Sequence, residues 1–255
     1  MILIPQYRTT RRAAAANTLK QLFDGGAYGF WYDYGNDALV WQDSARSTPA
    51  ANGDPIGGVT DKSPNGLHAA QSTSGNRPTR SGGAAVGDRV SDYLTTTVSL
   101  STNKAFLFAV ITTPASIAAN EGVVSYYTPG ALDYNTAANG VAAYYSGSTS
   151  ITAFRAASLG SRTVAASTKY LLCSIYDGTS NKMSLNGGAE SSASSTGTFS
   201  FTRVSQLARH GAGGVAAING WSATKIHEVA LVTGVAISSG DVALVISEMM
   251  ARNGI

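Results

Sequence analysis

From Tyr28 onward, the chain alternates short apolar runs with clusters of Gly, Asn, Asp, Ser and Pro. Runs of this length between turn-forming residues are typical of β-strands, because helices need a longer periodic segment. Ten such runs predict either two packed sheets or a closed barrel. We expect strands over residues 29–34, 93–98, 104–112, 122–127, 140–145, 150–156, 169–176, 182–185, 198–204 and 225–232.

The C-terminus predicts a helix instead. Ser238 or Ser239 can cap a helix over residues 240–252, and the Gly254 that follows Asn253 is suited to end it. Apolar residues recur along one side of this segment, so we expect it to pack on the β-sheets. Between the turns, the stretch 188–197 is rich in serine and is expected to be an exposed loop.

The N-terminus differs from the rest of the chain in charge. The first 20 residues carry four basic side chains and no acidic one, whereas the whole chain has 18 basic and 15 acidic residues. The remainder is therefore nearly neutral, so the net charge of +3 does not predict nucleic acid binding.

This basic segment also has helical features. Four consecutive alanines favour a helix over residues 11–23, with an apolar side that Gly25 and Gly26 would end. We predict an arm (residues 1–26) that docks on an acidic partner, followed by one β-domain (residues 27–255); the alternative is a frayed, solvated terminus. The predicted docking residues are Arg8, Arg11, Arg12, Leu19, Leu22 and Phe23.

Neither a secretory signal nor a membrane-spanning segment is expected. The chain opens apolar and becomes basic only after Pro5, which is the reverse of a signal peptide. The longest strongly apolar run, residues 105–111, is far shorter than a bilayer span. Cys173 alternates with Leu171 and Ile175 on one strand face, so we expect a buried thiol without an intrachain disulfide, consistent with synthesis in a reducing cytoplasm.

The sequence offers no obvious catalytic residues. Its four glutamates are scattered, without the closely spaced carboxylate pair expected on one strand of a sandwich glycosidase. The histidines lack a metal-ligand spacing, and no nucleophile-elbow motif is present. We therefore expect no enzyme activity, metal or cofactor, although a calcium ion could be bound by oxygen ligands from Asp33, Asn36, Asp37 and Asp43.

Aromatic residues are the better candidates for a binding site. A flat ring can cover one face of a sugar while neighbouring polar groups bond its hydroxyls. Adjacent tyrosines in a strand face opposite sides, so one of each pair is expected in the core. The candidate glycan-binding residues are Trp41, Tyr127, Tyr145 and Trp221.

Several motifs resemble a domain of tailed bacteriophages. Two of them lie in the second half: residues 170–187 look like paired strands that end in an Asn-Gly turn, and residues 221–250 look like a closing strand and helix. Those in the first half begin at Tyr28 (Tyr-Gly-Phe-Trp-Tyr-Asp), Trp41 (Trp-Gln-Asp-Ser-Ala), Gly53 (Gly-Asp-Pro-Ile-Gly), Asp61 (Asp-Lys-Ser-Pro-Asn-Gly-Leu-His-Ala) and Arg77 (Arg-Pro-Thr). Together they resemble, over residues 27–254, the concanavalin A-like, laminin-G-type jelly roll of virion structural proteins; residues 86–94 match its pattern only loosely.

This resemblance implies a fold of two antiparallel sheets and a role in the virion. The expected protein is a capsid decoration or head-fibre type surface protein, made in the host cytoplasm and anchored by its arm to capsid or tail proteins. Viral symmetry suggests a homo-oligomer, such as a trimer. The alternative is a glycan-binding adhesin module of a tail fibre or spike that attaches the virion to polysaccharide.

Overall fold

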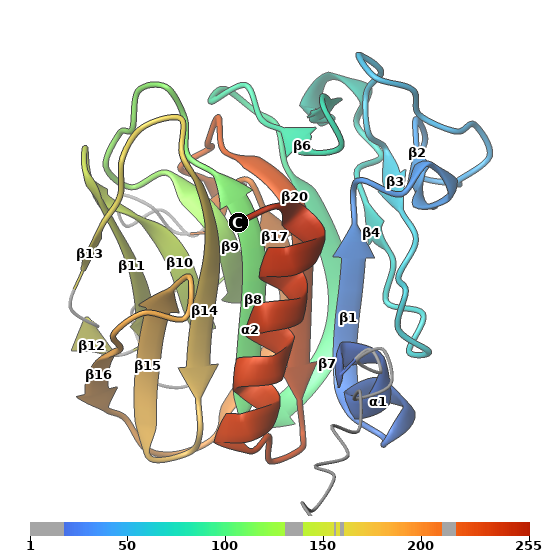
Figure 1. Cartoon of the computed structure of the whole chain (residues 1–255). Helices are drawn as coiled ribbons and strands as arrows, with labels where there is room; N and C mark the ends of the chain where they lie inside the picture. The colour runs from blue at the N-terminus through green and yellow to red at the C-terminus, as the bar shows by residue number, and fades with distance from the viewer. Residues whose placement is uncertain (1–17, 131–139, 156, 159–160, 211–217) are drawn as a thin grey trace, which may run out of the picture.

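The computed structural model describes residues 18–130, 140–155, 157–158, 161–210 and 218–255. Two large antiparallel sheets pack face to face, and two helices lie outside one of them (Figure 1). The prediction of an all-β sandwich with a helix near the N-terminus and another at the C-terminus is therefore confirmed. The helices are α1 (Thr18–Asp24) and α2 (Ser239–Asn253), and two 3-10 turns are η1 (Asp37–Leu39) and η2 (Ser74–Asn76).

The first sheet, sheet A, contains the most apolar strands. Its order is β16-β15-β14-β8-β20-β6-β5, and β1 also pairs with β20. Two strands have the bounds that the sequence predicts: residues 169–176 in sheet A and residues 122–127 in the second sheet. The strands of sheet A are β1 (Tyr28–Asp33), β5 (Thr79–Arg80), β6 (Ala85–Val86), β8 (Ala105–Thr112), β14 (Lys169–Tyr176), β15 (Ser180–Leu185), β16 (Ser191–Ser194) and β20 (Lys225–Thr233).

The second sheet, sheet B, has the order β12-β11-β10-β9-β17-β7-β4-β3-β2, with β13 paired to β11. A separate two-stranded ribbon, β18 (Arg209–His210) with β19 (Ile218–Asn219), lies beside β9. The strands of sheet B are β2 (Val40–Trp41), β3 (Gly58–Val59), β4 (Ala69–Ala70), β7 (Leu94–Thr102), β9 (Gly122–Tyr127), β10 (Gly140–Gly147), β11 (Ser150–Arg155), β12 (Ala157–Ser158), β13 (Arg162–Thr163) and β17 (Phe199–Gln206).

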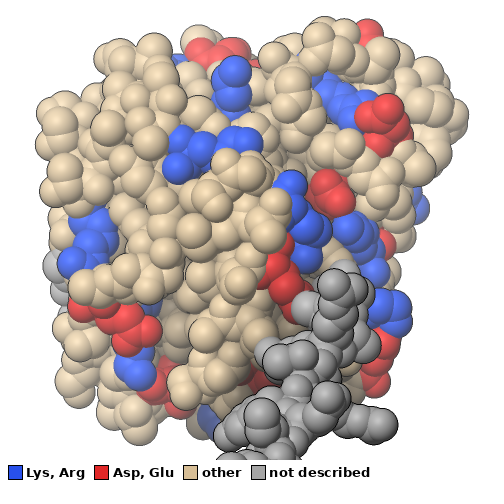
Figure 2. Space-filling model, in the orientation of Figure 1, with Lys and Arg blue, Asp and Glu red and all other residues tan. Residues whose placement is uncertain are grey.

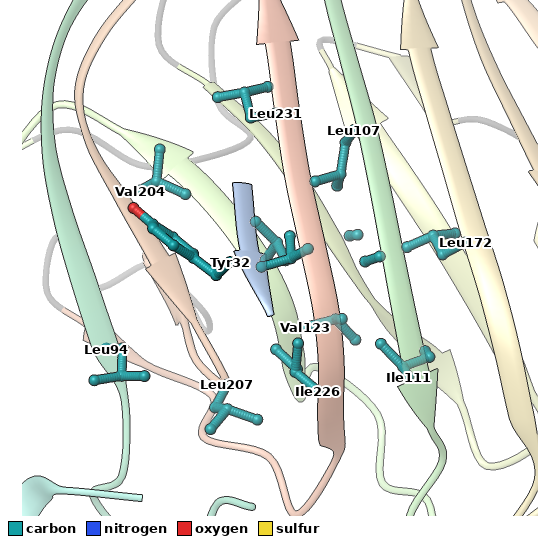
Figure 3. Close-up of a cluster of buried hydrophobic side chains, with 14 of the residues drawn as sticks. Tyr32, Leu94, Leu107, Ile111, Val123, Leu172, Val204, Leu207, Ile226 and Leu231 are labelled. Carbon is teal, nitrogen blue, oxygen red and sulfur yellow. The ribbon is translucent and has the colours of Figure 1, made fainter. Parts of the chain in front are cut away.

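The main core fills the space between the two sheets (Figure 3). Alternate residues of each strand point inward, so Leu107 and Leu231 of sheet A face Val204 of sheet B. Aromatic rings close the layer, and Tyr126 stacks on Phe201 with ring centroids 5.1 Å apart. Burial of these side chains supplies the main driving force for closing the sandwich.

The middle of the outer face of sheet A is also buried, because α2 packs on β8 and β14 and α1 packs beside α2 (Figure 1). Trp31 of β1 and Cys173 of β14 lie in this second core, in contact with a cluster that includes Val245 of α2. The expected burial of Cys173 is thus confirmed. Because both faces of β8 and β14 are buried, their sequences are nearly continuous runs of apolar residues.

A buried carboxylate fixes α2 to this face. Glu228 of β20 accepts hydrogen bonds from Trp31 Nε1 at 2.7 Å, Arg252 at 2.9 Å and Asn253 at 2.7 Å. The helix begins where Ser238 Oγ accepts a hydrogen bond from the Asp241 amide, and it ends at the left-handed Gly254 (φ 66°). The predicted C-terminal helix and its Ser238 cap are confirmed.

The structure changes the interpretation of the N-terminal arm. Leu19 and Phe23 are buried in the second core, and Thr18 bonds to Glu248 of α2. The apolar side of α1 therefore packs within the domain, because sheet A leaves a hydrophobic face beside α2, so Leu19 and Phe23 are core residues and not docking residues. Leu22 lies at the rim of the same cluster, while Arg8, Arg11 and Arg12 lie outside the described residues.

The serine-rich stretch is likewise not simply a loop. Residues Ser191–Ser194 form β16, which pairs with β15 at the edge of sheet A. An edge strand needs backbone hydrogen bonds on one side only, and its side chains can remain half exposed, so a low-hydrophobicity segment can supply it.

The Leu19→Ala variant tests whether α1 belongs to the domain. Removing this fully buried side chain should lower the free energy of unfolding by about 2–4 kcal/mol, measured by urea denaturation. Lys20→Ala, at an exposed position of the same helix, should change it by less than about 1 kcal/mol. Equal stability of the two variants would show that α1 does not pack on sheet A.

Candidate functional site

The candidate site lies at one end of sheet B, where three chain segments meet. Two backbone hydrogen bonds join β10 to the segment just before β9. The Tyr145 amide donates to Glu121 O at 2.9 Å, and the Asn120 amide donates to Tyr145 O at 2.7 Å. The Gly122 amide bonds Gly220 O at 2.7 Å. These bonds place Tyr144, Glu121 and Trp221 on adjacent segments, although they are far apart in the sequence.

A buried ion pair forms the centre of this site. Arg89 Nε lies 2.5 Å from Glu121 Oε1, and the Glu121 side chain is only 8% exposed. Ser222 Oγ contributes a longer hydrogen bond of 3.4 Å to the same carboxylate. Burial raises the pKa of Glu121, while the hydrogen bond and charge of Arg89 act in the opposite direction. The guanidinium remains partly exposed and has further N–H groups to offer a ligand.

The loop between β6 and β7 presents Arg89. Gly87 allows its close approach, because a Cβ at this position would lie 2.1 Å from Ser222 O. The Asp88 carboxylate then accepts hydrogen bonds from the amides of Val90, Ser91 and Asp92 and closes the turn. Within it Arg89 has a φ of 66°, an uncommon conformation for a residue with a side chain.

Aromatic rings lie on the outer face of sheet B, and Arg209, which covers one of them, bonds Asn120, the neighbour of Glu121. The Arg209 guanidinium lies over the Tyr144 ring, 3.9 Å from its centroid. Further along β9, His210 of the β18–β19 ribbon stacks on Tyr127 with centroids 4.1 Å apart. Beyond the ribbon, β7 and β17 present a row of exposed hydroxyls from Thr97, Ser99, Ser101, Ser200 and Thr202.

A second perturbed carboxyl lies in the same loop. Asp92 is buried, and burial together with the nearby charge of Asp88 raises its pKa to about 7. Asp92 therefore retains its proton at mildly acidic pH, where an ordinary aspartate is ionised.

The four predicted glycan-binding residues lie in different surroundings. Trp221 is partly exposed and directly precedes Ser222, which bonds Glu121; its indole nitrogen is buried without a hydrogen-bond partner among the described residues. Tyr127 faces outward but is covered by His210. Tyr145 is wrongly chosen: it is fully buried and bonds Thr224, because Tyr144 is the member of that pair that faces out. Trp41 lies apart on β2, where its indole N–H bonds Thr60.

Three of the four candidate calcium ligands, Asp33, Asn36 and Asp37, line one pocket, and Asp43 does not. Asp33 pairs with Lys62, Asp37 pairs with Arg80, and Asp43 accepts hydrogen bonds from the amides of residues 47 and 48. Within the described ranges, no group of three or more His, Cys, Asp or Glu is placed to hold a metal ion. Nor does any helix in the described part of the chain have the length and apolarity needed to span a membrane.

Sequence reasoning missed Arg89, Glu121 and Arg209. Each is an ordinary polar residue in a loop or at a strand end, and their proximity arises from long-range pairing. Tyr144 was one of the aromatic candidates, but its neighbour Tyr145 was chosen in its place. One signal was available: residues 86–94 depart from the pattern of the resembled family, and the structure places Arg89 and Asp92 in that stretch.

Comparison with known proteins shows the fold. No protein-family model matches the chain, and no curated protein matches it by sequence. Among solved structures, it is similar to an arabinofuranosidase complexed with arabinofuranosyl-α-1,2-xylobiose (TM-score 0.63, 11% identity, covering 91% of this chain and 64% of that one). A GH54 α-L-arabinofuranosidase soaked with a cyclic sulfate inhibitor gives a TM-score of 0.62 at 11% identity, with the same coverage. A sialidase of Trypanosoma rangeli in complex with sialic acid gives 0.52 at 13% identity, covering 89% of this chain and 33% of that one.

These matches correct the functional prediction. The structures that share the fold are carbohydrate-active enzymes, which contradicts both the phage virion role, whether capsid decoration or adhesin, and the expectation that the chain is not an enzyme. The resembled motifs specify turns and core positions of a β-sandwich, and such positions do not distinguish one function from another. The chain spans 64% of the length of the arabinofuranosidases.

The Asp92→Asn variant tests the perturbed carboxyl. Between about pH 4 and pH 7 the unfolded chain loses this proton while the folded protein keeps it, so Asp92 makes the natural protein less stable as the pH rises. From pH 4 to pH 8 the free energy of unfolding of the variant should rise relative to the natural protein by roughly 1–4 kcal/mol. The control Asp24→Asn, at an exposed site, should show no such change. Parallel pH profiles for Asp92→Asn and the natural protein would contradict the raised pKa.

Proposed function

We propose that this domain binds a polysaccharide across the outer face of sheet B, at the end where Trp221, Tyr144 and the Arg89–Glu121 pair meet. The observation that carries the proposal is this convergence of partly exposed rings with fixed charged groups. An aromatic ring covers the apolar face of a sugar, while guanidinium and carboxylate groups bond its hydroxyls.

The arrangement of the layers supports this location. The middle of the outer face of sheet A is covered by α1 and α2 and carries a second hydrophobic core. Sheet B instead presents exposed hydroxyls of β7 and β17 alongside the site, which can hydrogen-bond a chain of sugars. The fold is also that of proteins described as complexed with sugars.

Trp221→Ala should reduce affinity for the bound polysaccharide at least tenfold, measured by calorimetry with a glycan first selected on an array. Trp41→Ala is the matched control, because this tryptophan lies at the β2 edge of the same sheet and should leave affinity unchanged. Loss of binding in Trp41→Ala with normal binding in Trp221→Ala would place the site elsewhere and contradict the proposal.

A second candidate function is hydrolysis of the bound glycan. The observation that favours it is Asp92, whose pKa of about 7 suits a general acid near neutral pH. In this scheme Asp92 would protonate the leaving oxygen as the glycosidic bond breaks, and Glu121 would accept the proton of the water that forms the new bond to the sugar carbon.

This candidate has its own test. Asp92→Asn should retain glycan binding but release reducing sugar at least a hundredfold more slowly than the natural protein. If the natural protein releases no sugar from any glycan that it binds, the hydrolysis proposal is wrong and the binding proposal stands.

A further inference from the structure

A pocket of about 520 Å³ opens beside Arg89, at the end of the sandwich where β8 ends and β20 begins. It is lined by Arg89, Lys225 and several residues of the two neighbouring loops, and no acidic residue lines it. Its size suits a sugar unit or one of its substituents. The remaining lining residues are Thr112, Thr113, Pro114, Ala115, Ser116, Ser167 and Ala223.

Positive charge is concentrated around this pocket by strand pairing. Lys225 of β20 and Lys169 of β14 are both direct cross-strand partners of Thr112, the last residue of β8, and so flank it on either side. Figure 2 shows Lys and Arg side chains gathered over the ends of β8 and β14 at this end of the sandwich. Lys169 donates a hydrogen bond to Asn253 O, whereas Lys225 is exposed.

The neighbouring acids offset this charge only in part. Glu121 is paired with Arg89, and the Asp88 carboxylate accepts hydrogen bonds from amides of its own loop, so Lys225 and Lys169 supply most of the net positive charge. His227, which bonds Thr112, has its pKa lowered to about 4 by burial and by the charges of Lys169 and Lys225, in keeping with a positive potential there.

The rim supplies hydroxyl donors. Ser116 and Ser167 are exposed residues of the two loops that line the pocket. Ser167 has a φ of 51°, so a residue with a side chain adopts a left-handed conformation at this rim, as Arg89 does on the other side. Such conformations are uncommon and are concentrated at ligand sites.

We propose that this pocket binds the anionic substituent, a carboxylate or a sulfate, of an acidic polysaccharide, with Lys225 and the free N–H groups of Arg89 as the charged partners. The inference rests on the proposed function for the identity of the polymer, because Arg89 lies between the pocket and the sugar-binding face. The anion site itself can be tested without any glycan.

The glycan test compares charged and neutral forms of one polymer. Oligogalacturonate and its methyl ester distinguish a carboxylate, and dextran sulfate and dextran distinguish a sulfate. The natural protein should bind one charged form at least tenfold more tightly than its neutral counterpart, and Lys225→Gln should remove most of that preference. Lys104→Gln is the matched control, because Lys104 directly precedes β8 and so lies at the opposite end of the same strand. Equal binding of charged and neutral forms, or an equal loss in Lys104→Gln, would overturn the proposal.

Inorganic sulfate separates the anion site from the proposed function. In the natural protein, sulfate titration should shift the amide NMR signals of Ser116 and Ser167, and Lys225→Gln should weaken this binding about fivefold or more. Sulfate binding without binding of any glycan would leave the anion site in place and contradict the polysaccharide proposal. Glycan binding that depends on Trp221, with no response to sulfate at these serines, would support the proposed function and overturn the anion site.

Discussion

Burial of sheet A on both faces is the constraint on which the rest of the structure depends. Strand β20 carries Val229 and Leu231 into the core between the sheets, and it carries Ala230 and Val232 into the core beneath the helices. An exposed face of this kind would be unstable in water, so α1 and α2 have to cover it. This arrangement leaves sheet B as the layer with the more accessible outer face.

The part of the fold that depends on local sequence was predictable. The apolar runs of β8 and β14, the Ser238 cap and the outward–inward alternation of Tyr126 with Tyr127 each follow from patterns within a few residues. Two-residue strands such as β5 and β6 were not predictable, because they owe their existence to pairing with distant strands. The packing of α1 within the domain was not predictable for a related reason: an amphipathic helix indicates that an apolar partner exists, but it does not say whether that partner belongs to the same chain.

The site was less predictable than the fold. The pair formed by Arg89 and Glu121 joins a loop to a strand start 32 positions away. The segment that carries Trp221 is brought to them by the Gly122–Gly220 and Ser222–Glu121 hydrogen bonds. Motifs that specify turns and core positions therefore identified a sandwich but assigned it to the wrong class of protein. A pKa shifted by burial, such as that of a buried carboxyl that keeps its proton, can be inferred only when the long-range packing is known.

The buried thiol of the second core can be used to measure how often this domain opens. Its single thiol, Cys173, is 1% exposed, and burial raises its pKa to about 12. The folded protein therefore offers thiol reagents neither access nor a thiolate. Since α2 and α1 have to leave sheet A before the sulfur can react, the rate of alkylation reports how often the helices detach, without any label or substitution.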